Sequence, residues 1–446
     1  MQSEIRTISY PNGEIQRFQI VRWGSWDQLG FLTPSHTPET LDRFADIYRN
    51  YLVPAAPWIF GHLVMFHLPD DFSTELPVSA DPSGTVASPL TAAAALLQEG
   101  VSIKGHKPVF HNEAARKLWF ALEQPNCIRI VSGRLPVTKI IPISNVSGYI
   151  SKAMPGAALK VNASFFIMDP FDCATVYDHA GRPFGLCVKD GKVIHPPLYN
   201  REALLVKQTG DVTIRHLDVT DLEIEINGHF FRHGKNAAIY TRPKRMHAPG
   251  GKSKYYIITG CEVAAVSKRP TVIPASGFVL CPYEDTKIPV NAAVVYHGLE
   301  NVRFGIQVGN SILKDGIPTE GFHSRFYNIR RLEPISFPPS LYPMHFDKDR
   351  AARIALGADE NGNPMLLWAE GAAKIGYIPG EGSCGATLKE LAEICGQAGM
   401  KNAVNLDGGG SAQILLNNER ILQISDRDAQ SLSESERPIP LGLVVQ

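Results

Sequence analysis

Most of the chain beyond residue 126 alternates between short apolar runs and turn-forming residues. The runs are rich in β-branched and aromatic side chains, and Gly, Asn, Asp and Pro separate them. This pattern is typical of strands joined by tight turns. The runs that predict strands are residues 158–168, 184–188, 203–206, 237–241, 255–259, 302–308 and 353–357. We therefore expect a core dominated by β-structure.

Helical periodicity is confined to a few segments. Thr37 with Pro38 predicts a helix start, and the apolar positions that follow up to Leu52 recur at helical spacing. A second helix is expected over 112–123. A capping box, Thr387 with Glu390, precedes an apolar stripe that Gly399 can close.

These elements predict an α+β fold in which a β-rich, mixed-sheet catalytic domain with few helices follows a smaller N-terminal region. The predicted boundaries are 1–125 for an N-terminal accessory region of unknown role and 126–446 for the main domain. The prolines between residues 68 and 90 predict a loop or linker there.

Composition excludes several classes of protein. The chain has 446 residues, with 44 basic and 44 acidic side chains and no long basic run, which argues against a nucleic-acid partner. No apolar stretch is long enough for a membrane helix, and no signal peptide is visible, so a cytoplasmic location is the default expectation. Seven cysteines without a C-x-x-C pair disfavour a zinc cage and a full disulfide framework.

One segment combines a carboxylate with flexible backbone. A predicted buried strand, 402–406, runs directly into Asp407, three glycines and Ser411. The strand end would present Asp407 at the rim of a sheet, and glycine backbone can turn successive N–H groups towards one anion. A plain turn is the alternative, since Asp-Gly is a common turn signal. The lysine of a nucleotide-binding phosphate loop is missing.

Further motifs occur in a fixed order around this segment. They are Asn162 to Phe166, Gly185 to Val193, Arg353 to Gly357, Asn405 to Ser411, and Glu436-Arg437-Pro438. In this order they resemble the phosphodiester glycosidase family, over roughly residues 150–446. Ala163-Ser164 stands where the family has two glycines, Ile354 stands for a threonine, and a long insertion spans 317–349. A copy of the Asn162 motif at Asn227-Gly228 is interpreted as a β-turn.

The resemblance implies a role for each matching residue. Asp407 would stabilise positive charge at the anomeric carbon, while Arg353 and Arg437 would hold the departing phosphate. Asn162 would orient sugar hydroxyls or an acetamido group. Ser411 and the N–H groups of Gly408, Gly409 and Gly410 would bind phosphate. For a second catalytic carboxylate, Glu381 and Glu436 both stay open.

The implied function is a hydrolase that cleaves the anomeric bond of a sugar-1-phosphodiester in a glycan or glycoconjugate and releases free sugar. The alternative is a non-catalytic carbohydrate- or phosphate-binding module of a surface or phage assembly. We expect a glycan or sugar-phosphate as the substrate, with no cofactor and no metal, because His229 and His233 do not form a metal-binding motif. Family members commonly act outside the cytosol, which leaves an extracellular or envelope location open.

Overall fold

The computed structural model describes most of the chain. The residues outside the description are 36–39, 41–42, 44–61, 70, 73–85, 106, 134–137, 144–147, 168–172, 174, 243–244, 308, 310, 320–348, 374–375 and 429. The helix predicted after Thr37 and most of the 317–349 insertion fall there.

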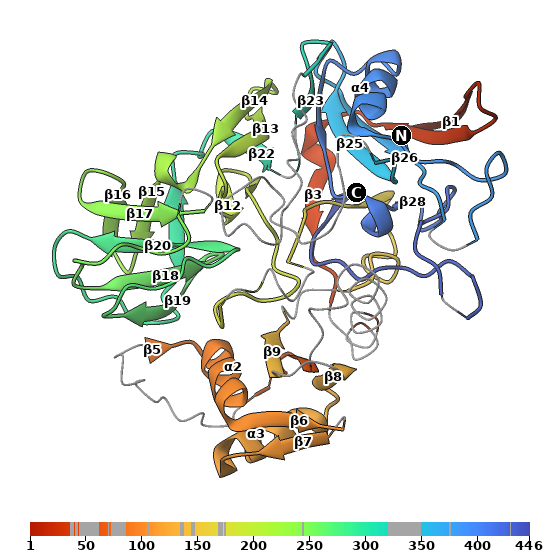
Figure 1. Cartoon of the computed structure of the whole chain (residues 1–446). Coiled ribbons are helices and arrows are strands. Elements are labelled where there is room, and N and C mark those ends of the chain that lie inside the picture. Colours follow the sequence, from red (N-terminus) through yellow and green to blue (C-terminus); the bar gives the residue numbers. More distant parts are fainter. Residues whose placement is uncertain are drawn as a thin grey trace.

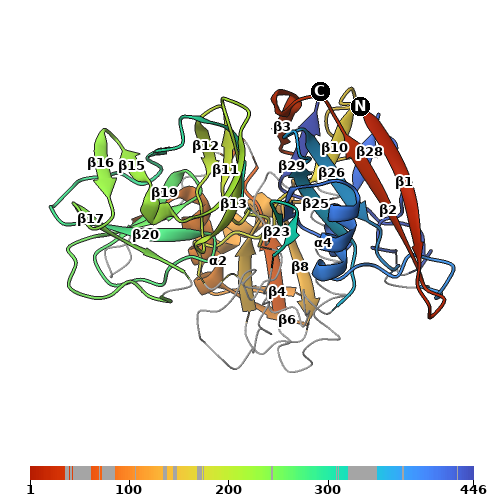
Figure 2. The same ribbon diagram turned by 90° about the horizontal axis from the view of Figure 1, so that it is seen from above.

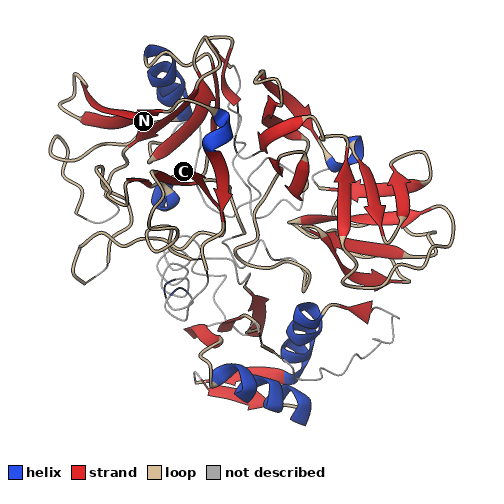
Figure 3. Cartoon of the chain, turned by 180° about the vertical axis from the view of Figure 1, so that it is seen from behind, coloured by secondary structure: helices blue, strands red, loops and turns tan. Residues whose placement is uncertain are grey.

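The α+β expectation is wrong, because the fold is mostly β. Strands take up 43% of the residues and helices 13%, with three α-helices in the part that is described. The sheets are arranged as a propeller-like ring (Figure 1). Strands dominate the two upper lobes, whereas the lower lobe combines helices with strands (Figure 3). The two predicted helices that the structure describes, at 113–123 and 388–397, pack against sheets rather than forming a layer of comparable size.

Two sheets carry most of the motifs that surround Asp407. The larger has the strand order β1 (Gln2–Ser9), β2 (Ile15–Arg22), β26 (Pro364–Ala369), β25 (Arg353–Ala358), β27 (Asn402–Asn405), β23 (Ser311–Lys314), β24 (Ile317–Pro318). The smaller has the order β28 (Ile414–Leu416), β10 (Leu159–Asn162), β29 (Gly442–Val445), β3 (Leu29–Leu32).

The remaining strands form five further sheets in the described part of the chain. Two five-stranded sheets have the orders β12 (Lys192–His195), β11 (Cys187–Lys189), β22 (Val302–Ile306), β13 (Arg201–Lys207), β14 (Val212–Leu217) and β17 (Ala237–Thr241), β20 (Gly277–Pro282), β18 (Tyr255–Thr259), β19 (Glu262–Ser267), β5 (Val86–Ala87). The smaller sheets are β16 (His229–Arg232), β15 (Glu223–Ile226), β21 (Val294–His297); β8 (Ile128–Gly133), β4 (His62–Phe66), β9 (Thr138–Pro142); and β6 (Val101–Lys104), β7 (Lys107–Phe110).

The central strands β25 and β26 of the seven-stranded sheet are buried on both faces. Val161, Ile354 and Leu443 belong to one apolar cluster, which places the four-stranded sheet against one face. On the other face, Ala355 and Leu391 belong to a second cluster, which includes helix α4 (Leu388–Gln397). Figure 2 shows α4 lying along the outside of this sheet. Burial on both faces agrees with β25, in which every residue is buried.

Local sequence signals placed two of the helices correctly. Thr387 and Glu390 form the expected capping box at the start of α4. Asn112 caps α3 (Glu113–Glu123) by accepting a hydrogen bond from the Ala115 N–H. Helix α2 (Pro89–Gly100) begins inside the predicted linker, with Pro89 at a position that favours a helix start.

Other local expectations are also confirmed. The predicted strands correspond to β10, β11, β13, β17, β18, β22 and β25. Asn227 and Gly228 both have positive φ and join β15 to β16, so this copy of the motif is a hairpin turn. Six of the seven cysteines are buried, and Cys261 is partly exposed.

Candidate active site

The Asp407 loop lies where the seven-stranded and four-stranded sheets meet. The Leu406 N–H donates to the Ile354 carbonyl at 2.8 Å, and the Asp407 N–H donates to the Ala163 carbonyl at 3.0 Å. Asn162, at the end of β10, completes the link: its amide donates to the Asp407 carbonyl at 2.7 Å and accepts from the Gln413 N–H at 3.0 Å. The loop is therefore fixed to both sheets.

The Asp407 carboxylate is almost fully buried, with 9% of the residue exposed. Burial raises its pKa to about 6, although the Ser411 hydroxyl, the Gly408 N–H and the charges of Arg437 and Arg353 all favour the ionised form. The Gly408 N–H donates to Oδ1 at 2.9 Å. A carboxylate with a pKa this close to neutrality is well suited to acid, base or electrostatic catalysis.

Each glycine of the loop meets a separate geometric demand. A Cβ on Gly408 would lie 2.6 Å from the Ala352 carbonyl oxygen, and Gly409 has φ of +57°. A Cβ on Gly410 would overlap the Arg437 guanidinium and the Asp426 carboxylate. The N–H groups of Gly408 and Gly409 are hydrogen-bonded within the protein. Phosphate binding by the glycine N–H groups stays a prediction.

Arg437 lies beside the Asp407 loop and forms a buried ion pair with Asp426. Its Nε and Nη2 donate to the two Asp426 oxygens at 3.0 and 3.1 Å, and Nη1 is 3.4 Å from Ser411 Oγ. Arg437 is 4% exposed and Asp426 is 3% exposed. This bidentate geometry fixes the plane of the guanidinium. The guanidinium of Arg43 approaches Asp426 as well, at 3.7 Å.

Arg353 is the second buried arginine whose charge acts on Asp407. It is 1% exposed, and its guanidinium donates to the carbonyls of Ala386 at 3.1 Å and Asp349 at 2.9 Å. Burial lowers its pKa to about 10, while Asp349 and Asp407 act in the opposite direction. At neutral pH the side chain is cationic, so the charges of two buried guanidinium groups, Arg353 and Arg437, act on the Asp407 carboxylate.

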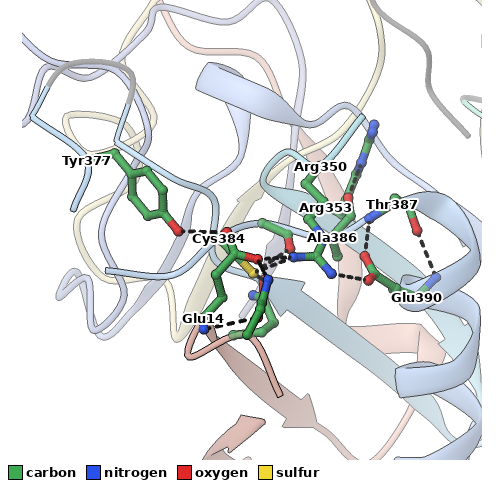
Figure 4. A network of polar contacts seen from close by, with 11 residues as sticks. Glu14, Arg350, Arg353, Tyr377, Cys384, Ala386, Thr387 and Glu390 are labelled. Atoms are coloured by element: carbon green, nitrogen blue, oxygen red, sulfur yellow. Dashed lines mark hydrogen bonds and ion pairs between the residues drawn. The ribbon is translucent and has the colours of Figure 1, made fainter. Parts of the chain in front are cut away.

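An ionic network supports the segment that holds Arg353 (Figure 4). Arg350 pairs with Glu14 at 2.8 Å and with Glu390 of α4 at 2.6 Å. The Tyr377 hydroxyl is 3.4 Å from the Glu14 carboxylate. Because Glu14 lies in the turn between β1 and β2, the N-terminal hairpin contacts the Arg353 segment directly.

The two candidates for a second carboxylate lie in different settings. Glu436 accepts from the Ser151 N–H at 3.1 Å and is 3.5 Å from Arg420, so its oxygens have protein partners. Glu381 is exposed in a turn, where its N–H donates to the Ile378 carbonyl. Neither glutamate has a contact with Asp407 among the hydrogen bonds and ion pairs of the described residues. Their catalytic role stays a prediction.

Sequence reasoning missed Asp426 and three buried polar atoms near the loop. Ser164 Oγ, Asn405 Oδ1 and Ser425 Oγ have no hydrogen-bond partner in the described part of the chain. Ser164 follows the residue that binds the Asp407 N–H, and Asn405 precedes Asp407 by two positions. No local signal marks Asp426, since its partner Arg437 lies eleven residues away across a loop.

Two further features concern the described residues as a whole. They contain no cluster of three or more His, Cys, Asp or Glu side chains arranged to hold a metal ion. None of the helices among them combines the length and apolar character needed to cross a bilayer.

The sequence profile of a family described as phosphodiester glycosidase matches residues 220–446. This range includes Arg353, Asp407 and Arg437 but not Asn162. The N-acetylglucosamine-1-phosphodiester alpha-N-acetylglucosaminidase of Mus musculus is 40% identical over 67 residues, which cover 15% of this chain and 11% of the mouse protein.

Two solved structures are also similar. A hypothetical protein from Synechocystis has 19% identity and a TM-score of 0.39, over 68% of this chain and 55% of that one. The zebrafish N-acetylglucosamine-1-phosphodiester alpha-N-acetylglucosaminidase catalytic domain, auto-inhibited by its pro-peptide, has 15% identity and a TM-score of 0.34, over 67% of each chain.

Proposed function

This chain belongs to the phosphodiester glycosidase family, and from that premise we propose that it is a hydrolase that cleaves the anomeric bond of a sugar-1-phosphodiester in a glycan or glycoconjugate. The observation that carries the proposal is the buried Asp407 carboxylate, whose pKa is raised to about 6 and on which the charges of two buried arginines act. Such a site combines one anionic group with fixed positive charge. The anionic group matches the positive charge that develops on the sugar, and the fixed positive charge matches the negative charge on the departing phosphate.

The proposed reaction separates charge along the bond between C1 and the phosphate oxygen. As this bond breaks, its electron pair leaves with the phosphate monoester, and positive charge develops on the sugar ring. The ionised Asp407 carboxylate stabilises that charge. Water supplies the oxygen that bonds to C1, and its proton passes to a base or to solvent.

The arginines act on the other side of the breaking bond. A phosphate monoester is a good leaving group, so it needs little protonation and benefits from fixed positive charge. Arg437 and Arg353 already have protein partners, and we propose that they act mainly through their charge and by positioning Ser411 and the loop. Asn162 donates from its side-chain amide to the Asp407 carbonyl and accepts from the Gln413 N–H, so it holds the loop at two points.

The direct test is release of reducing sugar from N-acetylglucosamine 1-(methyl phosphodiester). We expect turnover whose acidic limb in kcat/KM has an apparent pKa near 6, since Asp407 must be ionised. Asp407→Asn should abolish the turnover. Asp211→Asn, a matched change at an exposed carboxylate, should have no effect.

Isotope incorporation identifies the bond that breaks. In water enriched with oxygen-18, cleavage at C1 places the label in the sugar, whereas attack on phosphorus places it in the phosphate. Label in the phosphate would overturn the proposed mechanism. Absence of turnover on several sugar-1-phosphodiesters, with binding unchanged by Asp407→Asn, would favour a binding module.

A further inference from the structure

A cavity with polar and apolar side chains in its lining lies away from the residues of the Asp407 loop. It has a volume of about 620 Å³ and lies between the start of helix α2 and strand β19. Strand β5 pairs with β19, and the Ser88 N–H donates to the Ala264 carbonyl, so the two walls are hydrogen-bonded to each other. Figure 1 shows β5 and α2 beside the β18–β19 lobe. None of the proposed catalytic residues lines this cavity.

One wall of the cavity presents hydrogen-bond donors. Arg182 Nη2 lies 3.0 Å from His179 Nδ1, and because an arginine only donates, Nδ1 accepts and the neutral ring carries its proton on Nε2. Burial lowers the pKa of His179 well below its usual value, so the ring is neutral. His179 Nε2 and Arg182 Nε have no hydrogen-bond partner among the described residues, and both residues line the cavity.

The start of helix α2 adds positive potential to the same cavity. Ser88, Pro89 and Leu90 form part of the lining. Ser88 is the N-cap but makes no side-chain cap bond, since its hydroxyl donates to Thr91 Oγ1 at 3.0 Å. The amino end of a helix carries partial positive charge and unsatisfied N–H groups, which together favour an anion.

Two other residues of the lining offer hydrogen-bond acceptors. His195 Nδ1 lies 2.8 Å from the Gly185 carbonyl, so Nδ1 carries the proton and Nε2 is left as an acceptor. His195 Nε2 has no hydrogen-bond partner in the described chain, and the residue is 6% exposed. Glu262 lines the cavity as well and lies 3.7 Å from Arg182. These acceptors suit hydroxyl groups, which donate as well as accept.

We propose that this cavity binds a sugar that carries a negatively charged group. The charged group would lie against Arg182, the His179 Nε2–H and the start of α2. The hydroxyl groups would reach His195 Nε2 and Glu262, and apolar side chains such as Ile143 and Leu90 would cover the ring. The volume falls within the range of small-molecule sites and exceeds that of a single ion. The site does not use Asp407, so it is separate from the proposed hydrolysis.

Calorimetric titration of the full chain with glucose 6-phosphate, glucuronate and glucose tests the proposal. We expect at least one of the two anionic sugars to bind about tenfold or more tightly than glucose, and higher salt to weaken that binding. The comparison between them shows whether the charged group is a phosphate or a carboxylate. Failure of both anionic sugars to bind, or equal binding of glucose, would overturn the proposal.

Variants on the two walls locate the binding. Leu90→Trp should fill the cavity and weaken binding about tenfold or more, whereas Gln98→Trp, at an exposed position of the same helix, should leave it unchanged. Glu262→Gln should strengthen binding about threefold, because it removes the carboxylate that competes for Arg182. Thermal melts of each variant confirm folding, and Glu262→Tyr occludes the cavity from the other wall if Leu90→Trp does not fold.

The catalytic variant separates this site from the proposed active site. Asp407→Asn should bind the anionic sugar as the wild type does, whether or not the wild type hydrolyses phosphodiesters. Binding that is lost in Asp407→Asn and kept in Leu90→Trp would place the ligand in the Asp407 loop and refute a second site.

Discussion

Asparagine at position 407 should stabilise the protein at neutral and alkaline pH while it abolishes the proposed activity. The Asp407 pKa is about 6 in the folded chain, against 3.8 for an ordinary aspartate. A raised carboxyl pKa means that folding favours the protonated form. Its stabilising effect is complete below the unfolded pKa and disappears as the pH rises through the folded pKa.

The size of the effect follows from the pKa difference. A difference of roughly two units corresponds to about 3 kcal/mol, which is the cost of keeping the buried group ionised above pH 6. The neutral asparagine avoids this cost but loses the attraction of Arg437 and Arg353, which the pKa already includes. For a chain of this length, about 3 kcal/mol corresponds to a rise in Tm of about 3 °C.

Thermal melts of the wild type and Asp407→Asn between pH 4 and pH 8 measure this difference. We expect Asp407→Asn to melt higher at pH 8, and the gap to close as the pH falls from 6 towards 4. Asp211→Asn serves as the control and should show no comparable trend. A variant that is less stable than the wild type at pH 8, or a gap independent of pH, would refute the assignment of a raised pKa.

Three further changes address the supports of the site. Gly410→Ala should lower kcat/KM by about a hundredfold or more and reduce stability by about 1–3 kcal/mol, because its Cβ would displace Arg437; activity and melting measurements check both effects. Asp426→Asn should destabilise the chain by about 3 kcal/mol and shift the acidic limb of the pH profile to lower pH, since Arg437 then acts fully on Asp407. A pH profile that stays unchanged would contradict this coupling. Glu14→Gln should cost less than about 1 kcal/mol, because its ion pair is partly exposed, and kcat should change little.

Sequence patterns identified the elements whose signals are local. The capping box of α4 and the Asn112 cap of α3 depend on residues within one turn, and each was located to within a residue or two. The Asn227-Gly228 turn is equally local. Helix α2 was missed although Pro89 and the alanine-rich run after it are a helix-start signal, because the prolines upstream dominated the interpretation.

The fold class and the partners of the site depend on distant parts of the chain. The motif order led to Asp407, but the pairing of Arg437 with Asp426 requires the path of the intervening loop, which no periodicity specifies. The α+β expectation failed because the N-terminal residues and the connecting segments contribute strands that local patterns did not predict. These strands raise the strand content to 43%, against 13% for helices. Register between strands far apart in sequence follows from packing that local patterns do not encode.

The first residues of the chain also pair with strands that are distant in sequence. This pairing bears on the accessory region expected for 1–125. Strand β2 pairs with β26 and β3 pairs with β29, so residues up to Leu32 complete the two sheets that hold Asp407. By contrast, β4, β8, α2 and α3 share an apolar cluster of their own. Removing 1–125 would expose the edge of β26 and the Arg350 side chain that Glu14 now pairs. An accessory role is therefore better sought in residues 62–133, because the strands described in that segment belong to other sheets than the two that hold Asp407.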